Sequence, residues 1–140
     1  MSSYADVEIA VRQLHARYGD AVWRKDFDTL LTLYTKDCQW RFGGKTFNGP
    51  EEIVGNLRRV LPLFRRVLLT FRTPILSLGE GGTASSRTYM TEQVAFTDGT
   101  SGTSIGTYWD RFAFDQGEWK FSWRLWQTHY YGPADLSGSF

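Results

Sequence analysis

The side chains best suited to proton transfer in this sequence are two carboxylates and a histidine in its C-terminal half. Asp110 and Glu92 fall in the middle of strand-like segments, and His129 is the one histidine in such a segment. A carboxylate facing an aromatic pocket has a raised pKa and can exchange protons near neutral pH, while a histidine at a cavity mouth can act as a base. Structural roles are the alternatives. Asp110 could bond Arg87, Arg111 or a turn, whereas Glu92 could face a dimer interface and His129 the surface.

Aromatic side chains are numerous enough to line a pocket as well as a core. They make up 16% of the chain, and six of them are Trp. The rings expected to line a flat apolar slot, or else to pack the core or an interface, are Trp23, Tyr34, Trp40, Phe64, Trp109, Trp123 and Trp126.

Residues that bind metals or cofactors are sparse. His15 and His129 are too far apart for an i, i+4 metal pair, and neither lies in an acidic cluster. Cys38 alone can form neither an internal disulfide nor a cysteine-built zinc site. The glycine-rich residues 79–82 lack the strand-to-helix context of a phosphate loop. The sequence therefore predicts no metal and no cofactor.

The elements that position these groups are helical up to about residue 66. Apolar residues from Val7 to Val22 recur at helical spacing and predict a first helix over residues 4–24, with Tyr18 on its apolar stripe. Asp26 or Asp28 could cap a short second helix that carries residues 30–34. A turn at 35–37 would precede short strands at 38–42 and 45–47. A third helix would begin near Pro50 and end near Pro62.

After residue 66 the signals become those of β-structure. Segments 67–78, 83–96, 102–114 and 119–131 are rich in β-branched and aromatic residues and are separated by turn sequences. They predict an antiparallel meander covered on one face by three helices, an α+β fold. Alternation places Tyr108 on the same face as Asp110, and parity in segment 83–96 exposes either Tyr89 or Glu92 to a pocket.

The length and the net charge of the chain limit the classes of protein to which it can belong. The 140 residues contain no repeat or linker and predict a single domain over 1–140. Lys and Arg total 16 against 15 Asp and Glu, so no strong field would recruit nucleic acid or an anionic membrane. No apolar run reaches membrane-spanning length, and no leader pattern follows Met1. A cytoplasmic protein is expected.

Several short motifs in order along the chain resemble a known superfamily. They are Tyr18-x7-Asp26, Tyr34-x2-Asp37, Phe47-x-Gly49-x-Glu51-x-Ile53, Tyr108-Trp109-Asp110-Arg111-Phe112 and Asp115-x-Gly117-x-Trp119-Lys120-Phe121. In this order the chain resembles the nuclear-transport-factor-2-like superfamily and, within it, the SnoaL-like, scytalone-dehydratase-like branch. The resemblance implies a cystatin-like, cone-shaped α+β barrel, in which helices close a strongly curved sheet around a blind pocket. It also implies homodimers formed through the outer sheet face.

The resemblance also assigns positions to known chemistries. The Asp/His dyad of the dehydratase type would fall at Trp23 and Leu69, so both halves are absent. The two acids of an epoxide-hydrolase-like site would fall at Tyr89 and Leu125.

A ketosteroid-isomerase-like pair does match. It comprises Tyr18 and a protonated Asp110 as hydrogen-bond donors to an enolate oxygen, with Phe42 in place of the base. On the last strand, the resemblance suggests that Phe121, Trp123, Leu125, Gln127 and His129 point inward.

These observations favour a pocket protein for a small apolar or aromatic ligand. The leading hypothesis is a cofactor-independent lyase, isomerase or cyclase acting by proton transfer on a small cyclic, aromatic or polyketide-like substrate. Tyr18 and Asp110 would polarise a carbonyl, and Glu92 or His129 would move the proton. The alternatives are a non-catalytic binding protein for an apolar ligand and a dimeric protein-interaction module.

Overall fold

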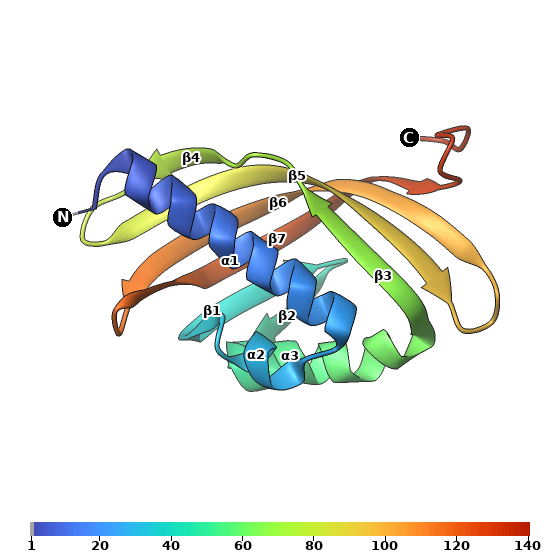
Figure 1. The fold of residues 1–140 in the computed structure, drawn as a ribbon, viewed down its shortest axis with the longest axis horizontal. Coiled ribbons are helices and arrows are strands. Elements are labelled where there is room, and N and C mark those ends of the chain that lie inside the picture. The colour runs from blue at the N-terminus through green and yellow to red at the C-terminus, as the bar shows by residue number, and fades with distance from the viewer. Residues whose placement is uncertain (1) are drawn as a thin grey trace.

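A computed structural model describes residues 2–140 as three helices packed on a curled, unclosed sheet (Figure 1). The helices are α1 (Tyr4–Arg24), α2 (Phe27–Leu31) and α3 (Gly49–Val60), followed by a 3-10 turn, η1 (Leu61–Leu63). The strands are β1 (Tyr34–Phe42), β2 (Lys45–Asn48), β3 (Phe64–Phe71), β4 (Ile75–Leu78), β5 (Thr83–Phe96), β6 (Ser101–Asp115) and β7 (Glu118–Gly132). The α+β class predicted from the sequence is confirmed.

Helix α1 begins and ends where the sequence predicts. Ser3 and Asp6 form a reciprocal capping box at its start, and Lys25 adopts a left-handed conformation at its end. Its apolar stripe is buried and includes Tyr18, which is 3% exposed. In Figure 1, α1 lies across the sheet, while α2 and α3 lie together near β1 and β2. The stripe therefore closes the core between helix and sheet.

The sheet is mixed rather than purely antiparallel. Its strand order is β2-β1-β7-β6-β5-β3, with β4 pairing to β5 beside β3. All pairs are antiparallel except β1 with β7, which run parallel. The meander prediction is therefore correct for the strands after residue 66 but missed this parallel pair, because two strands so distant in sequence leave no local signal of their pairing.

Two predicted boundaries are wrong. Tyr34 begins β1 instead of ending the second helix, and residues 35–37 continue that strand instead of turning. The predicted strand 67–78 divides into β3 and β4 around Pro74, which lies outside both strands. Proline cannot donate a ladder hydrogen bond, so a strand break there is expected.

Two β-bulges in β7 determine which of its side chains face the core. Phe112 pairs with Phe121 but Arg111 pairs with Trp123, so Ser122 is an extra residue. A second irregularity leaves His129 without a partner in the ladder. A bulge moves the following residues to the opposite face. Arg124 is therefore fully buried, whereas Trp123 and Leu125 border a hollow on the outer face.

No helix within residues 2–140 is long and apolar enough to cross a membrane.

Candidate functional site

A cavity of about 310 Å³ lies between α1, α3 and the concave face of the sheet. Its walls are mainly apolar and aromatic, which is typical of small-molecule sites. The rings that line it include Trp40 from β1, Tyr108 from β6 and Trp126 from β7. Trp126 can approach so closely because its neighbour Gly106 on β6 has no side chain: a Cβ there would overlap the indole ring. The cavity is thus a slot suited to a flat ring.

Glu92 is the only carboxylate among the described residues that line this cavity. It lies on the inward face of β5, which also carries the buried Met90. Of the two alternations that the sequence allows for this strand, the structure therefore has the one that places Glu92 in the pocket. Burial raises the pKa of Glu92 above its ordinary value. Within residues 2–140 no neighbouring charge or hydrogen bond offsets that rise. A carboxyl group in this environment can accept and return a proton near neutral pH.

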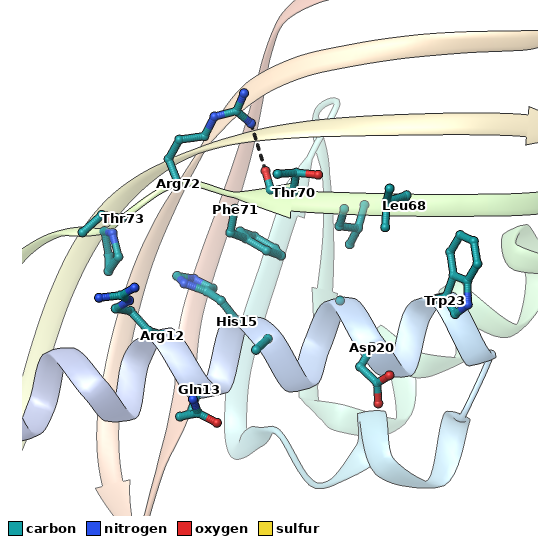
Figure 2. Close-up of a pocket in the computed structure, with 14 residues that line it drawn as sticks. Arg12, Gln13, His15, Asp20, Trp23, Leu68, Thr70, Phe71, Arg72 and Thr73 are labelled. Atoms are coloured by element: carbon teal, nitrogen blue, oxygen red, sulfur yellow. Dashed lines mark hydrogen bonds between the residues drawn. The ribbon is translucent and has the colours of Figure 1, made fainter.

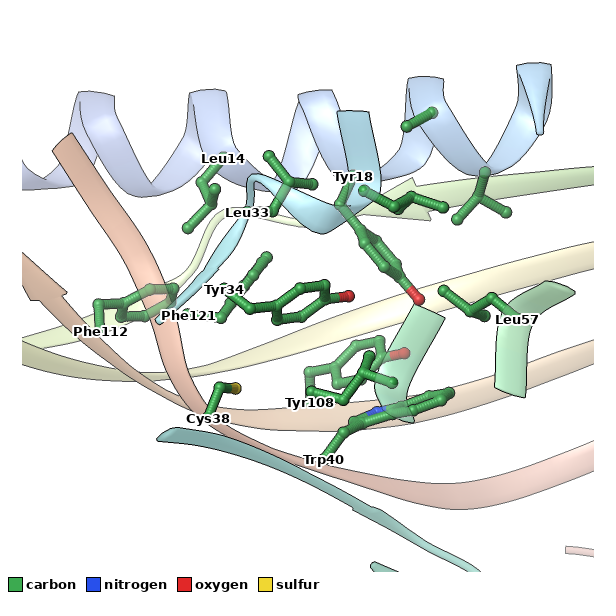
Figure 3. Close-up of a cluster of buried hydrophobic side chains, with 14 of the residues drawn as sticks. Leu14, Tyr18, Leu33, Tyr34, Cys38, Trp40, Leu57, Tyr108, Phe112 and Phe121 are labelled. Atoms are coloured by element: carbon green, nitrogen blue, oxygen red, sulfur yellow. The ribbon is translucent and has the colours of Figure 1, made fainter. Parts of the chain in front are cut away.

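Two phenols lie in the same cavity. Figure 3 shows the hydroxyl groups of Tyr18 and Tyr108 pointing into the space beside Leu57 and Trp40. Their rings meet edge to face with centroids 6.4 Å apart. Burial raises the pKa of Tyr18 and raises that of Tyr108 further, so both phenols stay protonated and are available as donors.

A buried arginine lies beneath these phenols. The Arg124 guanidinium carbon is 3.8 Å from the ring centroid of Tyr108 and 4.7 Å from that of Tyr18. Its positive charge opposes the effect of burial and lowers the pKa of both phenols in part. A phenol polarised in this way is a stronger hydrogen-bond donor to a developing oxyanion. Arg124 thereby acts on the cavity without lining it.

Asp110 and His15 hold Arg124 in place. Arg124 Nε donates to Asp110 Oδ1 at 2.7 Å and its Nη2 donates to Oδ2 at 3.2 Å. His15 Nε2 lies 3.1 Å from Oδ2, and its ring stacks on Phe71 with centroids 4.7 Å apart. All three polar side chains are at least 98% buried, so the cluster forms one charge-compensated unit inside the core.

The protonation states of this cluster follow from its geometry. Burial alone would raise the pKa of Asp110, but the charge of Arg124 and the hydrogen bonds from His15 and Arg124 lower it below its usual range. Burial lowers the pKa of His15, with Asp110 opposing only in part. Asp110 is therefore ionised and His15 neutral. Because an ionised carboxylate can only accept, the His15 proton is assigned to Nε2.

The structure brings seven of the predicted site residues together in the cavity: Tyr18, Trp40, Phe64, Leu69, Glu92, Tyr108 and Trp126. Asp110 faces inward, as predicted, but lies behind the phenols and bonds Arg124. It is therefore neither the neutral acid of the isomerase-like hypothesis nor a partner of Arg87 or Arg111. Tyr34 is buried in the core against Phe121.

The remaining predicted site residues lie outside the cavity. Trp23 borders a separate groove of about 630 Å³ between α1 and β3, shown in Figure 2. The inward orientation expected for Trp123, Leu125 and His129 is wrong because of the bulges in β7. His129 is exposed, and its Nε2 lies 2.7 Å from the hydroxyl of Thr107. Its ring neighbours Tyr89, which is 48% exposed, so neither reaches the cavity.

Sequence reasoning missed Asn56 in the cavity wall, the arginine beneath the cavity and the inward orientation of Trp126. Asn56 lies on the apolar stripe of α3 together with Ile53, Leu57 and Val60, and a polar residue on such a stripe is a signal that could have identified it. Trp126 and the buried Arg124 could not be placed from alternation, because the bulge before them has no sequence signature as clear as a turn.

The fold and this cavity define a class of protein in which helices and a curled sheet enclose a pocket. The SnoaL-like domain family model matches residues 4–124, and the chain belongs to that family. Comparison with curated proteins yielded no significant match.

Solved structures share the fold at low sequence identity. LinA is 23% identical, with 94% of this chain and 90% of that chain covered and a TM-score of 0.83. A putative scytalone dehydratase from Novosphingobium aromaticivorans is 17% identical, with 92% and 93% covered and a TM-score of 0.82. A putative aromatic ring hydroxylase from the same organism is 21% identical, with 98% and 100% covered and a TM-score of 0.86.

Proposed function

We propose that this protein is a cofactor-independent lyase, isomerase or cyclase that moves a proton on a small cyclic or aromatic carbonyl compound. The observation that carries the proposal is the position of Glu92, a carboxyl group with a burial-raised pKa, in a ring-lined cavity that also holds two protonated phenols. An acid–base group and oxyanion donors in one apolar slot are the minimum that enolisation needs. The family and the relatives' printed descriptions are consistent with such chemistry.

The roles follow from the chemistry of each group. The Glu92 carboxylate takes a proton from the carbon next to the substrate carbonyl. Tyr18 and Tyr108 donate hydrogen bonds to the oxygen, which gains negative charge as the enolate forms. Glu92 then returns the proton to another carbon in an isomerisation, or to a departing hydroxyl group in a dehydration. Each route balances without an added oxidant or reductant.

Hydrogen exchange tests the proposal directly. The protein would be incubated in heavy water with cyclic enones, hydroxy-ketones and polycyclic phenols, and mass spectrometry would follow deuterium uptake and water loss. We expect Glu92→Gln to abolish exchange and Tyr18→Phe to reduce it by about 10²-fold, the effect of removing one oxyanion donor. Glu118→Gln, at the exposed start of β7, is the matched control. Exchange that survives Glu92→Gln would contradict the assignment.

A non-catalytic binding protein is the second candidate. Two observations favour it. Trp23 and Leu69, which cannot act as acids or bases, occupy the positions that the resemblance assigns to the dehydratase dyad, and Asp110 is bonded to Arg124. Binding of the same panel, followed by tryptophan fluorescence, that is unaffected by Glu92→Gln and accompanied by no exchange would establish it in place of the enzyme.

We also propose that two copies pair through the outer sheet face, as the family resemblance implies. A hollow there is bordered by Ile75, Trp109, Trp123 and Leu125. Ile75 is 53% exposed, and apolar groups of this size on a sheet face are typical of contact surfaces. Sedimentation equilibrium should give a dimer, and Trp123→Glu should give a monomer. A monomeric native protein at micromolar concentration would contradict the pairing.

A further inference from the structure

Two cations line the cavity. Lys45 projects from β2 and Arg59 from the last turn of α3, and both line the cavity while remaining exposed. The guanidinium of Arg59 donates to the amide oxygen of Asn56, which is itself buried and lines the cavity. This hydrogen bond holds the Arg59 charge against the cavity wall. Within residues 2–140, neither cation forms an ion pair.

Lys45 and the carboxyl group of Glu92 lie on opposite sides of the slot. Lys45 lies on β2 at one edge of the sheet, whereas Glu92 lies on β5. Strands β1, β7 and β6 separate them, and neighbouring strands are about 4.8 Å apart. Trp40 and Trp126, on two of those intervening strands, provide the apolar middle of the slot. The cavity therefore has Lys45 on one side, aromatic rings in the middle and the protonatable Glu92 on the other side, with Arg59 of α3 as a second cation in its lining.

We propose that the substrate is a ring compound carrying a carboxylate, which lies against Lys45 and Arg59 while its reacting carbon lies near Glu92. The inference rests on the proposed function, because it assumes that this cavity is the ligand site. An anion at the Glu92 end would meet a carboxyl group with no cation to balance it. Beside Lys45 and Arg59 it meets two positive charges without acidic partners, and guanidinium groups bind carboxylates in a fixed geometry.

Matched ligands test the charge preference separately from catalysis. The probes are 2-naphthoate and methyl 2-naphthoate, which share the ring and differ in charge. Quenching of tryptophan fluorescence reports binding, because Trp40 and Trp126 line the cavity. We expect the native protein to bind the acid about tenfold more tightly than the ester at low salt and to lose most of that preference in 0.5 M NaCl.

Variants assign the preference to the two cations. We expect Lys45→Gln and Arg59→Gln each to weaken binding of naphthoate about fivefold, which is the size of effect that one exposed ion pair gives. Neither variant should change the binding of the ester. Arg58→Gln is the control on the same helix, because Arg58 stacks on Phe27 and does not line the cavity. Arg41→Gln is the control beside Lys45, because Arg41 is an exposed residue of β1 outside the cavity lining.

The outcomes separate this inference from the function. Equal binding of acid and ester, binding of neither, or equal losses in Arg58→Gln and Arg59→Gln would overturn the carboxylate assignment. Deuterium exchange on uncharged ketones would still support the enzyme. A preference for the acid that depends on Lys45 and Arg59, without exchange on any ligand, would support the carboxylate assignment and contradict catalysis.

Discussion

Replacing Arg124 with methionine should destabilise the protein in a way that depends on pH. In the native protein, Arg124 supplies two hydrogen bonds of 2.7 and 3.2 Å to Asp110, and both side chains are fully buried. Removing one partner of such a pair leaves an uncompensated buried charge, at a cost of about 3–5 kcal/mol. Methionine fills much of the arginine's volume, so the loss reports charge more than packing.

The sign of the pH dependence follows from the proton balance. In the native protein the lowered pKa of Asp110 gives stability that is present above its unfolded value and is lost as pH falls through the folded value. Without Arg124, burial dominates and the folded pKa of Asp110 rises, or its neighbour His15 takes up the proton instead. Either way the folded variant binds more protons than its unfolded chain between pH 5 and pH 8, so its free energy of unfolding falls as pH rises through this range.

Urea titrations followed by tryptophan fluorescence at pH 5 and pH 8 measure this difference. We expect Arg124→Met to lose more of the free energy of unfolding at pH 8 than at pH 5. At pH 8 the double variant Asp110→Asn with Arg124→Met should be more stable than the single variant. Arg111→Met, on the exposed face of β6, controls for removal of a surface arginine. A loss below about 1 kcal/mol, or one equal at both pH values, would refute the reasoning, because a buried charge without a partner must cost more.

Three further outcomes follow from the same structure. Glu92→Gln should be more stable than the native protein at pH 8 but not at pH 4 in urea titrations, because a raised folded pKa means that stability is lost as pH rises; equal stability at pH 8 would contradict the burial of this carboxyl group. The pKa of Cys38 is raised to about 12 by burial, so its thiol should react with a disulfide reagent at pH 8 only after unfolding; rapid reaction of the folded protein would show that the site opens. Gly106→Ala should lower stability by about 1–3 kcal/mol in thermal unfolding, since the new Cβ would meet both the backbone carbonyl oxygen of Gln127 and the Trp126 ring. An unchanged melting temperature would contradict this close packing.

The elements that could be predicted from the sequence are those with local signals. The stripe of α1 repeats at helical spacing and its capping box is local, so its limits were correct. Strand β5 lies between turn sequences and was also placed correctly.

The inward faces were predictable only where a strand has no bulge. On β6 the alternation around Asp110 holds, and Tyr108 is where the sequence predicts. On β7 the extra residue Ser122 moves Trp123 and Leu125 out and Arg124 in. The buried hydrogen bond between His15 and Asp110 could not be predicted either, because the two residues are 95 positions apart and meet only in the folded chain.

The parallel pairing of β1 with β7 has a consequence for synthesis of the chain. Strand β1 ends at Phe42, but its hydrogen-bonding partner begins only at Glu118. Contacts this distant must wait for most of the chain and slow the formation of the native state. On the ribosome the apolar stripe of α1 therefore lacks the strand that closes the core, and Asp110 lacks its partner Arg124, until β7 has emerged. Truncation within β7 should leave chains that cannot complete this step and expose the stripe to chaperones and proteases.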